Sequence, residues 1–181
     1  MKFTITREIG IDAGHRIPDH GSKCRSIHGH RYRILATVSS DRLHPSGEQK
    51  GMVLDFSFLK AIMMDEIDTP CDHGLILSRH DPLLSLMVDE ETVERIQQQF
   101  DLGLLDPPAN RYRVLKDPWG KLYIIDNPPT AEVLAQHWYR RIAPKVMAES
   151  KRLAKVESIT VWETPNCYAV YPLWPHGVID R

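Results

Sequence analysis

The sequence predicts an α+β fold, in which strands form toward both ends of the chain and amphipathic helices lie between them. Apolar and polar residues alternate over residues 1–16 and 28–39, which is the period of a strand with one buried face. Over residues 56–67 and 130–142 the apolar residues instead recur every three or four positions, as in a helix packed on a core.

The two alternating segments are expected to form neighbouring strands. In the first segment the odd positions are apolar apart from Arg7 and His15, and from Tyr32 to Val38 the even positions are apolar. Residues 18–22 are rich in turn-forming types and mark the loop between the strands. Because alternate side chains of a strand point to one face, an antiparallel pair would bury both apolar rows together.

Each helix begins after a residue suited to cap it. Asp55 precedes the first helix and Thr130 precedes the second, and both side chains can accept a hydrogen bond from a free N–H group of the first turn. Pro144 is expected to end or kink the second helix, because proline has no N–H to donate.

Residues 78–127 are interpreted as an inserted module. A helix is expected over 92–102, where apolar residues share one stripe. Residues 111–116 and 121–125 flank the sequence Asp-Pro-Trp-Gly, whose proline and glycine suit a tight turn. The module is therefore expected to contain a helix and a hairpin.

Two further strands, 158–163 and 168–171, are expected around a Pro-Asn turn near the end of the chain. Glu163 shares a strand face with the apolar residues Ile159 and Val161. A carboxylate in an apolar row is costly unless it has a partner or receives a ligand. If the strand ends there, Glu163 is instead a solvated turn residue.

Composition limits the function classes. The 181 residues, 42% of them hydrophobic, fit a single domain over 1–181 that carries the insertion at 78–127. A net charge of −1 argues against a general nucleic-acid binder, and no apolar run approaches the roughly 20 residues that span a bilayer. Three cysteines without framework spacing and a charged N-terminus without a signal core favour a cytoplasmic protein.

Three histidines are placed to bind a metal ion. His28 and His30 share a strand face, and His15 lies in phase with the buried face of the preceding strand. Three imidazoles without a fourth protein ligand are typical of a catalytic zinc that keeps one position open. A His-x-His pair alone occurs by chance, but His15 and the intervening thiol of Cys24 favour a site.

Two further groups are candidates for chemistry near the histidines. Cys24 is flanked by Lys23 and Arg25, a basic pair that could also hold an anion. Asp72 directly precedes His73, so its carboxylate could orient or charge the imidazole. Adjacent Asp and His residues are common by chance, and this second signal is weak by itself.

Six short stretches together resemble one family, that of 6-pyruvoyl-tetrahydropterin synthase and 6-carboxy-tetrahydropterin synthase. They occur in the family's order and leave out chiefly the insertion. The stretches are Asp-Ala-Gly-His-Arg-Ile-Pro (12–18), Cys-Arg-Ser-Ile-His-Gly-His (24–30), Gly-Met-Val-Leu-Asp-Phe-Ser-Phe-Leu-Lys (51–60), Cys-Asp-His (71–73), Pro-Thr-Ala-Glu-Val-Leu-Ala (129–135) and Val-Trp-Glu-Thr (161–164).

The resemblance implies a tunnelling fold, with a four-stranded antiparallel sheet and two helices on one face. It also implies a homo-oligomer, a trimer or a hexamer of two stacked trimers, with active sites at subunit interfaces. Such an assembly would cover the sheet edges that a lone subunit leaves open.

The resemblance further assigns roles to individual residues. Glu163 matches the acid that anchors the pterin ring, with Thr130 and Glu132 in the same pocket, and Lys23 and Arg25 could hold a triphosphate tail or favour the thiolate. The remaining assignments are one Zn²⁺ per subunit on His15, His28 and His30, and catalytic roles for Cys24, Asp72 and His73.

The implied substrate is 7,8-dihydroneopterin triphosphate, which two branches of the family convert differently. One branch eliminates triphosphate to give 6-pyruvoyl-tetrahydropterin. The other also releases acetaldehyde and gives 6-carboxy-tetrahydropterin, for queuosine and other deazapurines. Three residues separate Cys24 from His28, as is typical of the bacterial carboxy branch, which we therefore favour.

The chain also departs from the family, and other functions stay open. Cys71 replaces an apolar residue before Asp72, and the insertion begins close to His73. The alternatives are the pyruvoyl synthase, a non-catalytic zinc- and pterin-binding module, and a structural zinc domain with Cys24 as fourth ligand.

Overall fold

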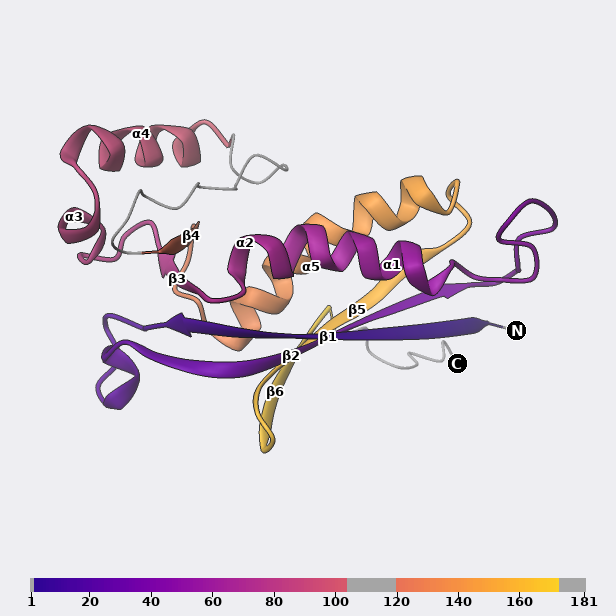
Figure 1. Ribbon diagram of the computed structural model, residues 1–181, viewed down its shortest axis with the longest axis horizontal. Helices are drawn as coiled ribbons and strands as arrows, with labels where there is room; N and C mark the ends of the chain where they lie inside the picture. The colour runs from indigo at the N-terminus through magenta and orange to yellow at the C-terminus, as the bar shows by residue number, and fades with distance from the viewer. Residues whose placement is uncertain (1, 104–119, 173–181) are drawn as a thin grey trace, which may run out of the picture.

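The computed structural model describes residues 2–103 and 120–172, which form a curled, mixed sheet with helices packed against it (Figure 1). Six strands lie in the order β4-β3-β1-β2-β5-β6. Their bounds are β1 Phe3–His15, β2 His28–Ser40, β3 Gly74–Ser78, β4 Lys121–Ile125, β5 Lys155–Thr164 and β6 Cys167–Tyr171.

The two long strands at the centre pair as the alternation predicts. β1 and β2 are antiparallel along their whole length, with Phe3 opposite Ser40 and His15 opposite His28. β5 continues the antiparallel arrangement beside β2, and β6 does so beside β5. One face of β1 and β2 is buried and the other is largely exposed, because their apolar residues fall on alternate positions.

The sheet differs from the expected four-stranded antiparallel one, because β3 and β4 extend it beyond β1 in the parallel direction. These short strands are apolar on both faces. Ile76 and Tyr123 belong to the main core, whereas Leu77 and Ile124 form a second core with Ile96. Strands with two buried faces are typical of parallel pairing beneath helices.

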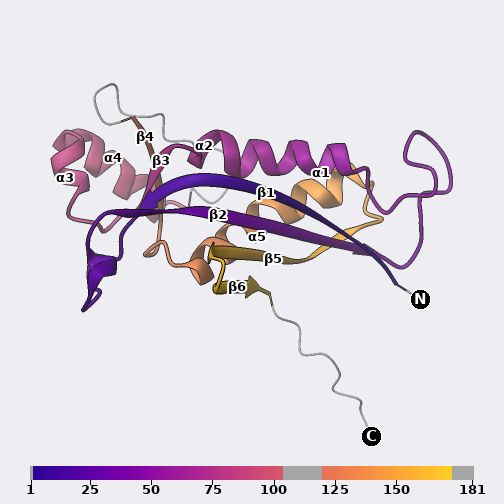
Figure 2. The same cartoon turned by 60° about the horizontal axis from the view of Figure 1, so that its bottom comes forward.

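Two helical segments cover the buried face of the sheet (Figure 2). α1 (Phe56–Met63) continues through a π-helical turn (Met64–Asp68) into α2 (Thr69–Cys71), and α5 spans Ala131–Glu149. Both expected caps are present.

The side chain of Asp55 accepts a hydrogen bond from the Ser57 N–H at 2.6 Å. The hydroxyl of Thr130 accepts one from the Val133 N–H at 3.3 Å. Each cap satisfies an N–H that the first helical turn leaves free.

Of the two outcomes expected at Pro144, an end or a kink of the helix, the first does not occur. The helix continues five residues beyond it, to Glu149. Ile142 and Val146 are both fully buried on either side of the proline. Their burial, each worth about 1.5–3 kcal/mol relative to exposure, offsets the hydrogen bond that the proline cannot make.

The segment 78–127 contains α3 (Leu84–Met87), α4 (Glu90–Asp101) and β4. The helix expected at 92–102 is confirmed, two residues longer at its start, where Asp89 caps it. The expected strand at 121–125 also forms, but it pairs in parallel with β3 rather than in a described hairpin.

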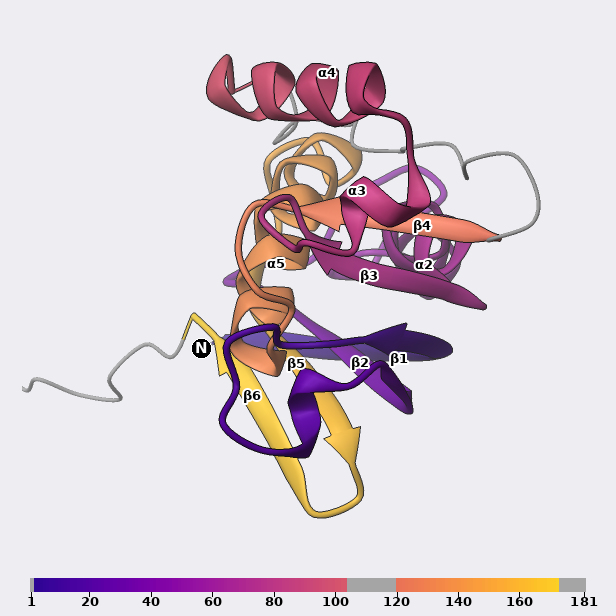
Figure 3. The same cartoon turned by 90° about the vertical axis from the view of Figure 1, so that its left-hand side faces the viewer.

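The proposed first hairpin strand, 111–116, lies outside the described residues. α4 packs over β3 and β4 at one end of the molecule (Figure 3). In the part of the chain that the structure describes, no helix combines the length and apolar character needed to cross a membrane.

Candidate active site

Three histidines converge where β1 ends and β2 begins. His15 lies opposite His28, and His30 lies opposite Ala13, one step further along the same face. Their ring centroids are 4.5–5.1 Å apart, and one ligand atom from each lies within 4.8 Å of the others. The antiparallel register thus brings together residues that are 13 and 15 positions apart in the chain, and these side chains could hold a metal ion.

Backbone contacts leave the Nε2 atoms of two of these rings available. His15 Nδ1 bonds to the carbonyl oxygen of Pro129 at 2.8 Å, and His28 Nδ1 bonds to that of Ser26 at 2.8 Å. Both Nδ1 atoms therefore donate, and each Nε2 keeps its lone pair, which is the state that binds a metal. His15 Nε2 is buried without a hydrogen-bond partner among the described residues, as expected of an atom that coordinates a metal ion.

The same environment favours the neutral form of two of these imidazoles, those of His15 and His30. The pKa of His15 is lowered to about 4, chiefly by burial and also by the neighbouring histidines, which together outweigh the Pro129 hydrogen bond that would raise it. Burial also lowers the pKa of His30, with His28 contributing. Neutral rings are the form in which histidine coordinates metals.

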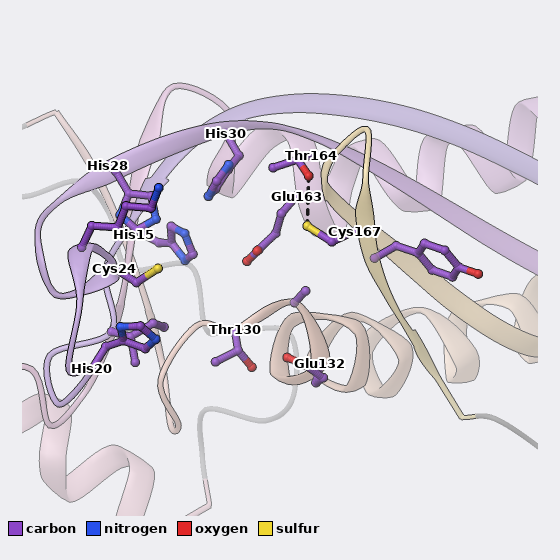
Figure 4. Close-up of a pocket in the computed structure, with 14 residues that line it drawn as sticks. His15, His20, Cys24, His28, His30, Thr130, Glu132, Glu163, Thr164 and Cys167 are labelled. Carbon is purple, nitrogen blue, oxygen red and sulfur yellow. Dashed lines mark hydrogen bonds between the residues drawn. The ribbon is translucent and has the colours of Figure 1, made fainter.

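A cavity of about 580 Å³ opens beside the three histidines. In Figure 4 the imidazoles and Cys24 line one side, and Glu163, Thr130 and Glu132 lie across from them. The cavity thus has nitrogen and sulfur ligand types at one end and carboxylates at the other. Its size is within the range of a small-molecule site.

A β-bulge aims Glu163 into this cavity. Trp162 pairs with Tyr168 and Thr164 pairs with Cys167, so Glu163 is the extra residue between them. Bulges re-aim side chains and are frequent next to active sites. Burial raises the pKa of Glu163, and repulsion from Glu132 raises it further, whereas His28 lowers it.

The other pocket residues predicted from the sequence divide into two groups. Lys23, Cys24, Thr130 and Glu132 line the cavity, with Cys24 half-buried in a 3₁₀ turn over Lys23–Arg25. The backbone N–H of Ile17 donates to the Cys24 carbonyl oxygen at 2.8 Å and holds this turn beside β1. Arg25 is not among the lining residues.

Asp72 and His73 form the expected pair, but away from the cavity lining. His73 Nδ1 bonds to Asp72 Oδ2 at 2.7 Å, and the Asp12 N–H donates to Asp72 Oδ1 at 2.9 Å. Burial alone would raise the pKa of Asp72, but these two hydrogen bonds outweigh it and lower the pKa. The His73 side chain is 77% exposed, so its imidazole is accessible to solvent in the single chain.

Several pocket residues were missed from the sequence. His20, Cys167 and Tyr168 line the cavity, and His20 Nδ1 accepts a hydrogen bond from the Ser22 N–H at 3.1 Å. His20 lies four residues before Cys24, which is the signal that could have identified it. Cys167 and Tyr168 line the cavity because β6 folds back along β5 beside Glu163. No local sequence pattern indicates this contact.

Comparisons with known proteins agree with this geometry. The family model of 6-pyruvoyl tetrahydropterin synthase matches residues 4–173. A 6-carboxy-5,6,7,8-tetrahydropterin synthase of Rickettsia conorii is 31% identical over 163 residues, 90% of this chain and 95% of the relative. The protein of that name from Haemophilus influenzae is 30% identical over 169 residues, 93% of this chain and 98% of its own length.

Solved structures share the fold. An uncharacterised protein from Wolinella succinogenes matches with a TM-score of 0.67 at 22% identity, over 97% of this chain and 99% of that one. The 6-pyruvoyl tetrahydropterin synthase of Caenorhabditis elegans matches with a TM-score of 0.54 at 18% identity, over 94% and 95%.

The resemblance inferred from six short stretches is therefore confirmed by matches over nearly the whole chain. The similarity to curated synthases also confirms the expectation of an enzyme of the 6-carboxy-tetrahydropterin synthase kind. The chain belongs to the 6-pyruvoyl tetrahydropterin synthase family.

Proposed function

We propose that the protein is a zinc-dependent lyase that converts 7,8-dihydroneopterin triphosphate to 6-carboxy-5,6,7,8-tetrahydropterin, with release of acetaldehyde and triphosphate. The observation that carries this proposal is a single cavity that joins three metal-binding imidazoles, the thiol of Cys24 and the carboxylate of Glu163. The names of the curated relatives support the carboxy branch, in agreement with the three-residue spacing before His28.

Zinc fits the donor set. Three neutral imidazoles suit Zn²⁺ and leave a coordination position for substrate. A zinc ion held there would supply Lewis-acid polarisation of the substrate's side-chain hydroxyls, which makes the neighbouring C–H groups more acidic.

Glu163 is proposed to anchor the pterin ring. Its carboxylate can accept two parallel hydrogen bonds from a ring N–H and the adjacent amino group, a geometry that fixes orientation as well as affinity. Thr130 uses its hydroxyl to cap α5 and so places the helix start, with Glu132, at this end of the cavity.

Cys24 is proposed to accept a proton from the side-chain carbon of the substrate, at the end of the cavity opposite Glu163. Lys23 lines the same wall and is proposed to contact the triphosphate. A triphosphate contact through Arg25 stays a prediction from the sequence, because Arg25 is not among the residues that line the cavity.

The second proton-transfer group is proposed to come from a neighbouring subunit. Asp72 and His73 are already hydrogen-bonded to each other, and the exposed imidazole is not part of the lining of its own cavity. In a trimeric or hexameric homo-oligomer, the pair could complete the cavity of the adjacent chain, in the way that the family resemblance implies.

The deciding experiment incubates zinc-loaded protein with 7,8-dihydroneopterin triphosphate and measures pterin products by mass spectrometry together with acetaldehyde. Stoichiometric acetaldehyde and a carboxy-pterin are expected. A pyruvoyl product without acetaldehyde would assign the chain to the other branch. Bound zinc without any turnover would contradict the proposed activity and favour a binding module.

The structural-zinc alternative predicts a fourth protein ligand from Cys24. Among the described residues, the cluster with suitably spaced ligand atoms consists of His15, His28 and His30, and Cys24 is not part of it. This arrangement favours a site with an open position. A zinc site that X-ray absorption shows to contain sulfur would overturn that preference.

A further inference from the structure

The turn that carries His73 has an unusual backbone. His73 has a φ of 54°, in the left-handed region that side chains other than glycine rarely adopt. Its N–H donates to the Asp12 carbonyl oxygen at 2.7 Å, while the preceding Asp72 N–H donates to Asp68 O at 2.8 Å. A strained residue persists where its surroundings hold it in place, and such residues cluster at functional sites.

Lys121, the first residue of β4, contacts the same turn. Its Nζ donates to the carbonyl oxygen of Asp72 at 2.8 Å and to that of Thr69 at 3.0 Å. Both carbonyls belong to the last turn of the helical segment that ends in α2, Thr69 as the first residue of α2 and Asp72 as its C-cap, where helical carbonyls lack intrahelical partners and a cation is favourable. The ammonium group therefore bridges the two sides of the turn just before His73.

The strand pairing explains why Lys121 reaches these atoms. Lys121 is opposite Gly74 in the parallel β3–β4 register. A Cβ added at Gly74 would lie 3.0 Å from Lys121 Cβ and 3.0 Å from the Cys71 carbonyl oxygen. The glycine thus permits a close approach of β4 to the turn, and any lateral shift of β4 would move the lysine relative to His73.

We propose that Lys121, which the segment 78–127 supplies, is a positioning residue for the Asp72–His73 pair. It holds the backbone of His73 in its left-handed conformation and so fixes the position of the imidazole. Lys121 acts through the backbone and does not touch the substrate. The inference rests on the proposed role of His73 in proton transfer, and it gives the insertion a function beside the catalytic pair. If Lys121 only stabilised the edge of the sheet, replacing it would leave the turn that carries His73 unchanged.

The test compares Lys121→Met, which keeps the length of the side chain but loses the donors, with Lys121→Arg, which keeps charge and N–H groups. Lys145→Met is the matched control, since Lys145 is a half-buried lysine that bridges the carboxylates of Asp65 and Glu66, away from the turn. Each zinc-loaded variant is examined for kcat, KM, zinc content and hydrogen–deuterium exchange of the peptide that covers residues 69–76.

Loss of the bridge is expected to lower kcat about tenfold or more, because small displacements of a catalytic group are costly. KM and zinc content should change little, and amide exchange in residues 69–76 should accelerate. Lys121→Arg should restore most of the kcat and most of the protection from exchange. Lys145→Met should match the wild type in kcat and in exchange over these residues. If Lys121→Met does not fold, the same comparison is made between Lys121→Arg and Lys121→Gln.

Unchanged kcat in Lys121→Met overturns the proposal, whether or not exchange accelerates, because the turn would then not need the lysine for catalysis. A wild-type protein that fails to turn over the pterin contradicts the proposed function instead. In that case exchange decides whether Lys121 holds the turn: acceleration in Lys121→Met that Lys121→Arg reverses supports it, and equal exchange overturns it.

Discussion

At the scale of single residues, the site depends on how burial selects charge states. His15 is the buried member of the histidine triad, and the cost of charging it there keeps its ring neutral. Burial also penalises the charged form of Glu163. Because a carboxyl is charged when it is deprotonated, burial favours its protonated form and raises the pKa. A ligand that donates two hydrogen bonds to Glu163 would favour its charged form, so this part of the cavity suits a ring rich in hydrogen-bond donors.

Replacing Cys24 by alanine is expected to separate catalysis from metal binding. The thiol lies in the cavity but outside the ligand cluster, so the variant should retain zinc at wild-type stoichiometry. Turnover should fall by about 10²–10⁴-fold, the usual contribution of a positioned acid–base group. Zinc analysis and single-turnover kinetics measure the two properties, and a parallel loss of zinc would make Cys24 a ligand.

Glu163→Gln is expected to weaken the binding of a pterin product about 10–100-fold, because a charge-assisted hydrogen bond contributes roughly 1.5–3 kcal/mol. In the wild type, affinity should fall as the pH drops through the raised pKa of Glu163, since the protonated group loses acceptor capacity. The Gln variant should show no such pH dependence in a fluorescence titration.

Glu157→Gln provides the control for this titration. Glu157 belongs to the same strand, but it pairs with Lys2 and Ser39 outside the cavity. Burial would raise its pKa, whereas Lys2 and Ser39 lower it to about 2. This variant should bind pterin like the wild type, and a matching loss of affinity would argue against a specific contact through Glu163.

Among the secondary-structure elements, α5 and the helical segment that begins with α1 are held together by a buried ion pair as well as by apolar packing. Arg141 on α5 donates from Nε to Glu66 Oε2 at 2.7 Å, and both side chains are about 1% exposed. Glu66 lies in the π-helical turn after α1, so the pair joins the two helical segments that cover the sheet. Breaking a buried pair costs more than replacing both partners, because the remaining charge loses a buried partner; here Lys145 still contacts Glu66.

Arg141→Met is therefore expected to destabilise the protein by up to about 3–5 kcal/mol, the range for an uncompensated buried charge, and by less to the extent that Lys145 compensates Glu66, as measured by urea unfolding. The double variant Arg141→Met with Glu66→Leu should recover much of this loss, since no buried charge remains. A single variant that unfolds within about 1 kcal/mol of the wild type would show that water reaches Glu66 after the change.

Sequence patterns identified most elements but not all of them. α1, α4 and α5 were predicted because their apolar spacing and their caps are local signals. β3 was missed because five residues with both faces buried show no alternation. The parallel pairing of β4 with β3 joins residues 47 positions apart (Gly74 and Lys121), and no local pattern encodes that choice.

At the scale of the whole molecule, the separation of His73 from its own cavity leads to a test of assembly. Cys24→Ala and His73→Ala, each inactive alone, are mixed after reversible dissociation and allowed to reassemble. If each active site combines Cys24 of one subunit with His73 of another, roughly a quarter of the sites in a random 1:1 mixture receive both intact groups. Activity of that order is expected.

No recovery of activity in correctly assembled mixtures would place both groups in one subunit. The control is a mixture of each variant with itself, taken through the same dissociation, which should stay inactive. Analytical ultracentrifugation before and after mixing checks that the oligomer has reformed.

Local signals in the sequence were enough to predict the family, the three histidines that could hold a metal ion, and the thiol and acid that line the same cavity, because these signals are residue types at fixed short spacings. His15, His28 and His30 could be placed together from strand periodicity alone. Tertiary pairing was needed to establish β3 and its parallel pairing with β4, the bulge that aims Glu163, the entry of Cys167 and Tyr168 into the cavity, and the absence of Asp72 and His73 from its lining. Those features depend on pairing between residues far apart in the chain, where packing energy and not local pattern selects the neighbour.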